Sequence, residues 1–198
     1  DVYKRQALDG KRFSVSNDFR PLGWHRILVE GTPTYWPKAK VQSPDATYVG
    51  AVVCDLDEVH YLTKSGTDYS NAVNGIAEFM STKFLHQFFP EVAKMITVSH
   101  GSVNFDKVNW KLVNALTVPC IRMDTLFASL KVQHINFAVI DVEGAELTVL
   151  NSIDFNKVVF DVLCIETDST NRPAGFARKV QLVLEKYGYI QDAIIGRN

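Results

Sequence analysis

Short unbroken runs of apolar residues and runs at helical spacing follow one another along the chain. The clearest unbroken run lies in residues 134–141, where four apolar residues lead directly into Asp141 and then Glu143. Such a run is typical of a strand covered on both faces, and Gly144 allows a sharp turn into the helix predicted at 145–150. We therefore predict a central strand whose carboxyl end carries two acids, at the edge where open α/β sheets bind ligands.

The same two patterns predict most of the remaining elements. Further strands are predicted at 24–30, 46–53, 58–63, 158–166 and 189–195, and further helices at 14–21, 33–41, 125–130 and 174–187. Strands that alternate with helices imply an α/β fold with a mostly parallel sheet and helices on both faces. Residues 76–89 carry large aromatic side chains at helical spacing, which favours ordinary core packing over the wall of a substrate pocket.

The length of 198 residues fits one domain, which we predict to span residues 7–198. Residues 1–6 share no pattern with the rest of the chain, and we interpret them as a candidate foreign segment. The periodic pattern weakens over 64–117, so we predict a variable insertion there.

The composition of the chain argues against some classes of binding partner. Hydrophobic residues make up 46% and charged residues 22% of the chain, as in an ordinary globular protein. A formal net charge of −1 removes the simple electrostatic case for a nucleic-acid partner. We also predict no membrane segment, since no apolar run approaches the roughly 20 residues needed to cross a bilayer. The pattern does not identify the compartment, for which the cytoplasm is the default, and we interpret Cys54, Cys120 and Cys164 as reduced thiols.

Three of the predicted strands end in an acid: Glu30, Asp141 and Glu166. A carboxylate at that edge can accept hydrogen bonds from a ribose diol. Leu8-Asp9-Gly10 are typical of the tail of a strand-to-helix turn, and Glu30 follows this turn at about the 20-residue offset that nucleotide folds use. Carboxylates on neighbouring strands can also raise each other's pKa and supply a general base. Structural roles stay open, with Asp141 as a helix cap, Glu143 as a solvated side chain, and Glu166 as a helix cap or ion-pair partner.

Other catalytic arrangements are less well supported. Asp168 and Asn171 could join Asp141 as oxygen ligands of Mg²⁺, but nothing in the spacing demands a metal and we predict none. The histidines are interpreted as structural rather than catalytic: His25, His60, His86, His100 and His134. The chain has no G-x-S-x-G elbow, Walker A loop or complete G-x-G-x-x-G, which argues against a hydrolase, an NTPase or a dehydrogenase.

Four segments, 118–126, 135–150, 153–155 and 165–166, resemble the FkbM-type methyltransferase family in order and spacing. Residues 23–33 are similar to its second-strand motif, Gly-Trp-x-Gly-x-x-Val-Glu-Pro-x-Pro. The resemblance implies a Rossmann-like sheet and S-adenosylmethionine as methyl donor. It also implies O-methylation of a hydroxyl on a small-molecule or glycan acceptor, such as a sugar or secondary metabolite.

The resemblance also assigns roles to individual residues. Those matched to the cofactor site are Asp9, Gly10, Ser16, Asn17, Glu30, Gly31 and Asp141. Asp141 and Glu143 match the Asp-x-Glu-Gly signature at the active-site edge, so one of them is predicted to be the base, with positioning of the two substrates alone as the alternative. We predict that Glu166 binds the methyl acceptor.

Both ends depart from the family pattern. The family's first strand should precede Leu8, and residues 1–6 do not supply it; the chain also ends at Asn198, where the last strand usually continues. We therefore expect a sheet truncated at both ends that binds the cofactor poorly. Two alternatives remain: a non-catalytic adaptor that keeps the fold, and a nucleotide-linked oxidoreductase, which the missing glycine fingerprint disfavours.

Overall fold

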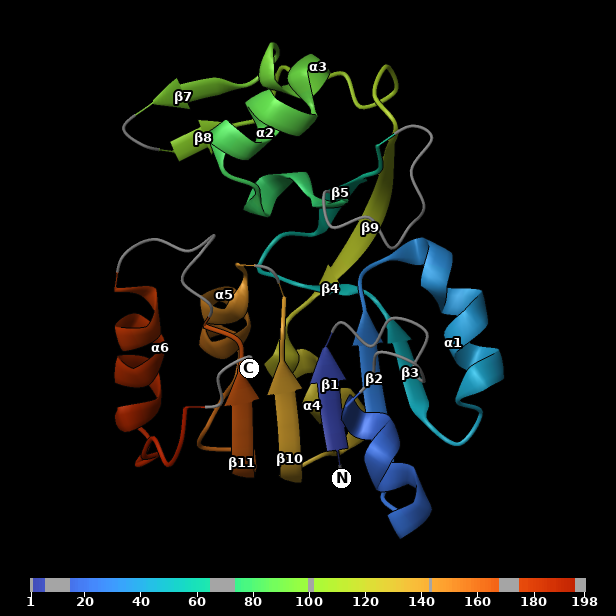
Figure 1. Cartoon of the computed structure of the whole chain (residues 1–198), viewed down its shortest axis with the longest axis vertical. Helices are drawn as coiled ribbons and strands as arrows, with labels where there is room; N and C mark the ends of the chain where they lie inside the picture. Colours follow the sequence, from blue (N-terminus) through green and yellow to red (C-terminus); the bar gives the residue numbers. More distant parts are fainter. Residues whose placement is uncertain are drawn as a thin grey trace.

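The computed structural model describes residues 2–5, 15–64, 74–99, 102–142, 144–167 and 175–194. Its main feature is a five-stranded sheet of order β11-β10-β1-β2-β3 (Figure 1). The strands are β1 (Val2–Arg5), β2 (Arg26–Glu30), β3 (Thr47–Gly50), β10 (His134–Ile140) and β11 (Val159–Ile165). All four pairings in this sheet are parallel.

The predicted central strand is confirmed. β10 pairs with β1 on one side and with β11 on the other, and Ala138, Val139 and Ile140 are buried. Every residue of β2 is buried, as expected for a strand covered on both faces. Its first residue, Arg26, is also fully buried, and its guanidinium donates to both carboxylate oxygens of Asp45 at 3.1 Å.

The expectation that residues 1–6 supply no first strand is wrong. Val2–Arg5 form β1, which lies between β2 and β10 and pairs in parallel with both. The apolar pattern missed this strand because ladder hydrogen bonds join backbone groups, which Lys4 and Arg5 supply as well as any residue does. Whether these residues are foreign to the chain stays a prediction.

In the described part of the chain, six helices accompany this sheet. They are η1 (Val15–Leu22), η2 (Pro33–Tyr35), α1 (Trp36–Gln42), α4 (Met123–Leu130), α5 (Glu146–Asn151) and α6 (Phe176–Glu185). Side chains of α4, α5 and α6 share the largest apolar cluster with β2, β10 and β11. The helix η1 packs its Phe19 ring 5.1 Å from the ring of Phe137 on β10.

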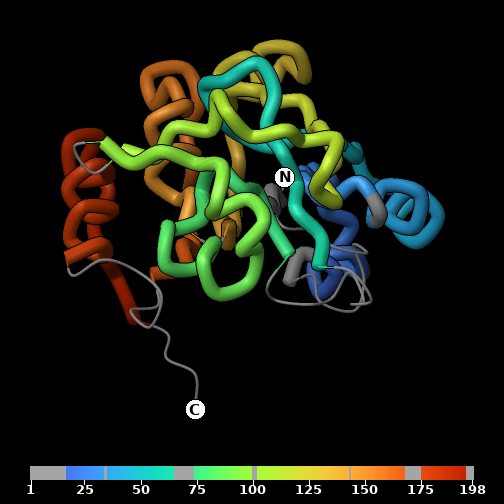
Figure 2. Tube along the Cα trace, turned by 90° about the horizontal axis from the view of Figure 1, so that it is seen from above, coloured from blue at the N-terminus to red at the C-terminus, as the bar shows by residue number. Residues whose placement is uncertain are grey.

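Residues 58–121, here called the cap, stand over the carboxyl edge of the sheet (Figure 1). Seen from above, the cap lies between α6 and α1 (Figure 2). It contains β5 (Glu58–Leu62), β6 (Gly75–Ile76), η3 (Ala77–Phe79), α2 (Thr82–Phe88), α3 (Pro90–Ala93), β7 (Thr97–Ser99), β8 (Ser102–Asn104) and β9 (Ala115–Ile121).

The helical spacing predicted at 76–89 is confirmed by η3 and α2. Leu85 and Phe89 are buried in the cap's apolar cluster, as the core-packing interpretation requires. Phe88 and Phe89 also line a cavity of about 420 Å³ with Thr63, Lys64, Gln87, Pro90, Glu91 and Asn114. The aromatic segment therefore serves as core and as cavity wall at once.

Two strand predictions need correction. The single strand predicted at 46–53 is two strands in different sheets, since β3 pairs with β2 whereas β4 (Val52–Val53) pairs with β9. The strand predicted at 189–195 does not form over residues 189–194, where Ile190 and Ile194 are more than 80% exposed.

Taken together, the sheets contain both parallel and antiparallel strand pairs. The second sheet has the order β4-β9-β5-β6, with antiparallel pairing of β5 to β9 and to β6, and β7 and β8 form an antiparallel pair. The fold is thus a set of helices and several sheets that are partly parallel. Within the described part of the chain, no helix has the length and apolar character needed to span a membrane.

Gly31 provides a test of how the two sheets meet. A Cβ atom there would lie 2.7 Å from Cγ2 of Val52, which is itself buried. We expect Gly31→Ala to lower the free energy of unfolding by about 1–3 kcal/mol through overpacking. The double variant Gly31→Ala/Val52→Ala should lose less than the two single variants added together, because Val52→Ala removes the obstructing methyl group. Urea denaturation of the four proteins measures this coupling, and simple additivity would contradict the contact.

Candidate functional site

The acids predicted at strand ends lie level with one another on one edge of the sheet. Lys4 of β1 pairs with Leu28 and with Val139, so Glu30 and Asp141 each stand two residues beyond the same level. One strand separates them, which corresponds to about 10 Å at the usual strand spacing. Residues level in a parallel ladder share a face of the sheet, so both carboxylates belong to one rim.

Glu166 extends this rim by one strand. It follows the last residue of β11, and its backbone N–H donates to the carbonyl of Ile140 at 2.9 Å. The ladder pairs Ile140 with Ile165, which makes Glu166 level with Asp141. Both carboxylates are half-buried. The structure therefore brings together Glu30, Asp141 and Glu166.

Glu30 is held in a closely packed environment. Its side chain is 1% exposed, and Oε1 accepts the backbone N–H of Thr32 at 2.7 Å. The indole N–H of Trp36 donates to the Glu30 carbonyl at 2.9 Å. The following residue, Gly31, leaves the space that Val52 fills. A buried carboxylate needs such donors, because burial without them is costly.

Two tyrosines stand within electrostatic reach of Glu30. Burial raises the pKa of Tyr48, and the negative charge of Glu30 raises it further. Burial and the same charge raise the pKa of Tyr61, although a hydrogen bond with the side chain of Thr32 opposes them. Both phenols are therefore hydrogen-bond donors at neutral pH. Among the described residues, the buried hydroxyl of Tyr48 has no hydrogen-bond partner.

The turn after Asp141 is shaped by a second buried acid, Glu146. Its side chain is 0% exposed, and Oε1 accepts the N–H groups of Val142 at 3.1 Å and Gly144 at 3.3 Å. Gly144 has a φ of 113°, which favours glycine and confirms the sharp turn predicted there. Glu146 thus fixes the backbone that carries Asp141.

The remaining predicted site residues are not placed at this rim. Asp9, Gly10 and Glu143, and the proposed metal ligands Asp168 and Asn171, lie outside the described residues. Ser16 and Asn17 lie in η1, which packs against a face of the sheet at Phe137. In the ranges that the structure describes, no group of three or more His, Cys, Asp or Glu side chains is arranged to hold a metal ion.

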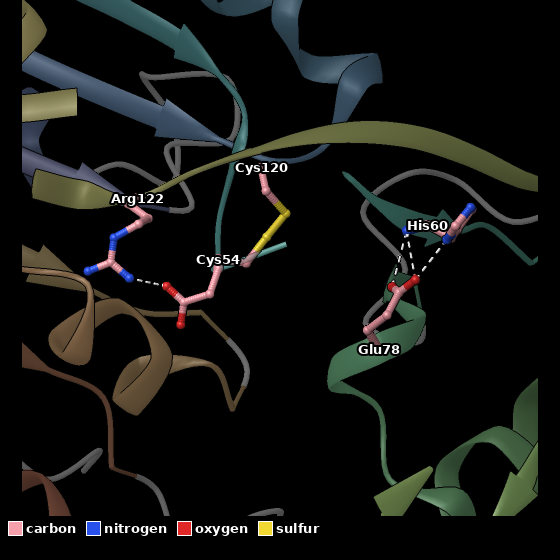
Figure 3. The surroundings of a disulfide bond; sticks show 6 residues. Cys54, His60, Glu78, Cys120 and Arg122 are labelled. Atoms are coloured by element: carbon pink, nitrogen blue, oxygen red, sulfur yellow. Dashed lines mark hydrogen bonds and ion pairs between the residues drawn. A yellow bond between two sulfur atoms is a disulfide. The ribbon is translucent and has the colours of Figure 1, made fainter. Parts of the chain in front are cut away.

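The prediction of three reduced cysteines is wrong for two of them. Cys54 and Cys120 form a disulfide with Cα atoms 5.4 Å apart, whereas Cys164 is a thiol (Figure 3). Beside the bond, Arg122 pairs with Asp55 and donates to Asp124 at 2.9 Å. The hydrogen bond from Arg122 holds the pKa of Asp124 below its usual range.

Three of the histidines make contacts with other side chains of the described part of the chain. His25 and His134 stand at the opposite edge of the sheet, where they contact Thr47 at 3.1 Å and Asp161 at 2.7 Å. His60 in the cap contacts Glu78 through Nδ1 at 2.7 Å (Figure 3). Its ring also stacks on the indole of Trp110.

Comparison with known proteins identifies the family. The family model described as Methyltransferase FkbM domain matches residues 5–190, which is most of the chain. The chain belongs to the FkbM methyltransferase family. No curated protein and no solved structure matches it. Membership of a methyltransferase family supports methyl transfer as the reaction of this FkbM domain.

The sequence missed several neighbours of Glu30 in this FkbM domain. The apolar pattern does not single out Thr32, and it places Tyr48 and Tyr61 only within the strands predicted at 46–53 and 58–63. The strand register could have identified Tyr48 as a neighbour of Glu30. Tyr48 pairs with Leu28, two residues before Glu30, and therefore lies on the same face of the sheet as Glu30. Tyr61 comes from the cap, and no local signal connects it to β2.

Glu146 provides a test of how the rim is built. We expect Glu146→Ala to lower the free energy of unfolding by about 1–3 kcal/mol, because two turn amides lose their acceptor. Hydrogen exchange at Val142 and Gly144 should then become faster. Glu185→Ala, in an exposed ion pair on α6, is the matched control and should leave both amides protected. Unchanged exchange in Glu146→Ala would show that Glu146 does not hold the turn.

Proposed function

We propose that this FkbM domain transfers a methyl group from S-adenosylmethionine to a hydroxyl oxygen of a small-molecule or glycan acceptor. The observation that carries the proposal is the level placement of Glu30 and Asp141 on one rim. In this proposal Glu30 binds the ribose hydroxyls, and Asp141 lies beside the reacting methyl group. The two strands are separated by β1 alone, so one extended ligand can reach both acids.

The sheet supports a Rossmann-like interpretation. Its order, β11-β10-β1-β2-β3, reverses direction at β1, because the chain first builds outward through β2 and β3 and then returns to β10. Ligands of open α/β sheets bind outside the carboxyl ends of the strands at such a switch point. Glu30 is the last residue of β2 and Asp141 follows the last residue of β10, and these two strands lie on either side of β1.

The residues around Glu30 fit a ribose. The Glu30 carboxylate is oriented by the N–H of Thr32, and a carboxylate is the kind of acceptor that the hydroxyls of a diol require. The hydroxyl of Tyr48, buried without a partner in the described part of the chain, offers a donor or acceptor to a polar ligand. Gly31 and Asp141 complete the proposed cofactor contacts, with Asp9, Gly10, Ser16 and Asn17 as further candidates.

The chemistry requires position and a proton acceptor. When bound, S-adenosylmethionine supplies an electrophilic methyl carbon on a sulfonium. The acceptor oxygen would displace the sulfonium sulfur as leaving group, so the protein has to align the acceptor with that carbon and remove a proton. The carboxylate of Asp141 or Glu143 would take the hydroxyl proton, and Glu166 would hold the acceptor beside it.

Substitution of Glu30 tests the ribose assignment. We expect Glu30→Gln to weaken S-adenosylhomocysteine binding by about tenfold or more, because charge-assisted hydrogen bonds are replaced by weaker neutral ones. Calorimetric titration measures the affinity. Glu58→Gln, at an exposed acid of β5, is the matched control and should bind like the unmodified protein. Equal affinities of the two variants would refute the assignment.

The same titration separates the alternatives. Binding of S-adenosylhomocysteine by the unmodified protein supports the methyltransferase. No binding by a folded protein supports a non-catalytic adaptor that retains the fold, and binding of NAD(H) instead supports an oxidoreductase. Transfer of labelled methyl to sugars and hydroxylated metabolites then tests the oxygen acceptor.

A further inference from the structure

Residues 54–57, here called the crossover, pass over strand β9, to which Cys54 is also bound by a disulfide. β9 lies between β4 and β5, so the chain must pass from one edge of β9 to the other. At the first edge, Cys54 N–H donates to the carbonyl of Ile121 at 3.3 Å. At the second edge, Cys120 N–H donates to the carbonyl of Asp57 at 3.1 Å. The Cys54–Cys120 disulfide joins this crossover to the strand beneath it.

The crossover has few other attachments. Asp55 pairs with Arg122, but both side chains are substantially exposed, and exposed pairs contribute little. Asp55, Leu56 and Asp57 are exposed, whereas Cys54 is 2% exposed. The disulfide is therefore the main side-chain link between the crossover and β9 (Figure 3).

The disulfide belongs to the same apolar cluster that packs behind Glu30. Cys54 and Cys120 share this cluster with Val52, Tyr61 and Trp36. Each of these three touches the end of β2: Val52 fills the space at Gly31, Tyr61 hydrogen-bonds the Thr32 side chain, and Trp36 donates to the Glu30 carbonyl. Direct contacts thus connect the crossover to the end of β2 that carries Glu30.

We propose that the Cys54–Cys120 disulfide is a redox-controlled clamp on the cofactor site, which is rigid when the bond is formed and loosened when it is reduced. This inference rests on the proposed role of Glu30 in binding the ribose. An oxidising environment retains the bond, and a reducing one lowers cofactor affinity without changing any residue that touches the cofactor.

The switching step is thiol–disulfide exchange with a dithiol. One thiolate of the dithiol attacks a sulfur of the bond, forming a mixed disulfide and releasing one cysteine as a thiolate. The second thiol of the dithiol then displaces the other cysteine. Two electrons pass from the dithiol to Cys54 and Cys120, which take up two protons, and the dithiol becomes a disulfide.

The test compares oxidised and reduced forms of the whole chain. We expect oxidised protein to bind S-adenosylhomocysteine about tenfold more tightly than protein held in dithiothreitol, with recovery on reoxidation. The double variant Cys54→Ala/Cys120→Ala should bind like the reduced form and ignore dithiothreitol. Cys164→Ala, which keeps the pair, should behave like the unmodified protein. Should the double variant fail to fold, reversible reduction of the unmodified protein gives the answer alone.

Hydrogen exchange separates failure of the clamp from failure of the proposed function. Reduction should speed exchange at residues 54–57 and at the Thr32 amide, whether or not the cofactor binds. Faster exchange without any cofactor binding would refute the proposed function and keep the mechanical link. Equal exchange and equal affinity in both redox states, with mass spectrometry confirming the bond in one and not the other, would overturn the clamp.

Discussion

Parallel registration of β10 against β1 is the constraint from which the site follows. The ladder fixes Asp141 level with Glu30 across β1, and the next ladder fixes Glu166 level with Asp141. Slippage by one residue would turn every side chain of β10 to the opposite face, and the burial of Ile135 between exposed His134 and half-buried Asn136 opposes such a slip. The backbone ladder therefore determines which acids can meet one ligand, although these acids are far apart along the chain.

A second constraint connects the sheet to the cap. After β3 the chain changes partners within a few residues, since β3 pairs with β2 whereas β4 pairs with β9. The cap begins at β5 and returns through β9, so both of its connections pass the end of β2. This path explains why Tyr61, a cap residue, contacts Thr32 beside Glu30. The cap is consequently part of the site's support, and its packing bears directly on the rim.

The sequence predicts the elements whose burial produces a recognisable pattern of apolar residues along the chain. β2, β10 and α6 were located because apolar runs and helical spacing reflect what each element packs against. Three features depend instead on partners remote in sequence. β1 pairs through backbone groups, which any residue supplies. β3 and β4 form one continuous apolar run, because a change of pairing partner does not alter the apolar pattern. Cys54 meets Cys120 only because β4 pairs with β9. Glu30 and Asp141 were predictable as strand ends, whereas Tyr48 and Tyr61 required the register.

The burial of Glu30 connects the fold to the proposed ribose site. A carboxylate that is 1% exposed is costly to keep ionised, and the N–H of Thr32 offsets part of that cost. The nearby tyrosines remain neutral donors, because burial and the charge on Glu30 both raise their pKa values. A ligand diol would add donors to a carboxylate that is already oriented, so little side-chain freedom is lost on binding. Such preorganisation requires a rigid surrounding frame, and the cluster that contains Val52, Trp36 and the disulfide forms it. Stability and recognition at this rim thus depend on the same contacts.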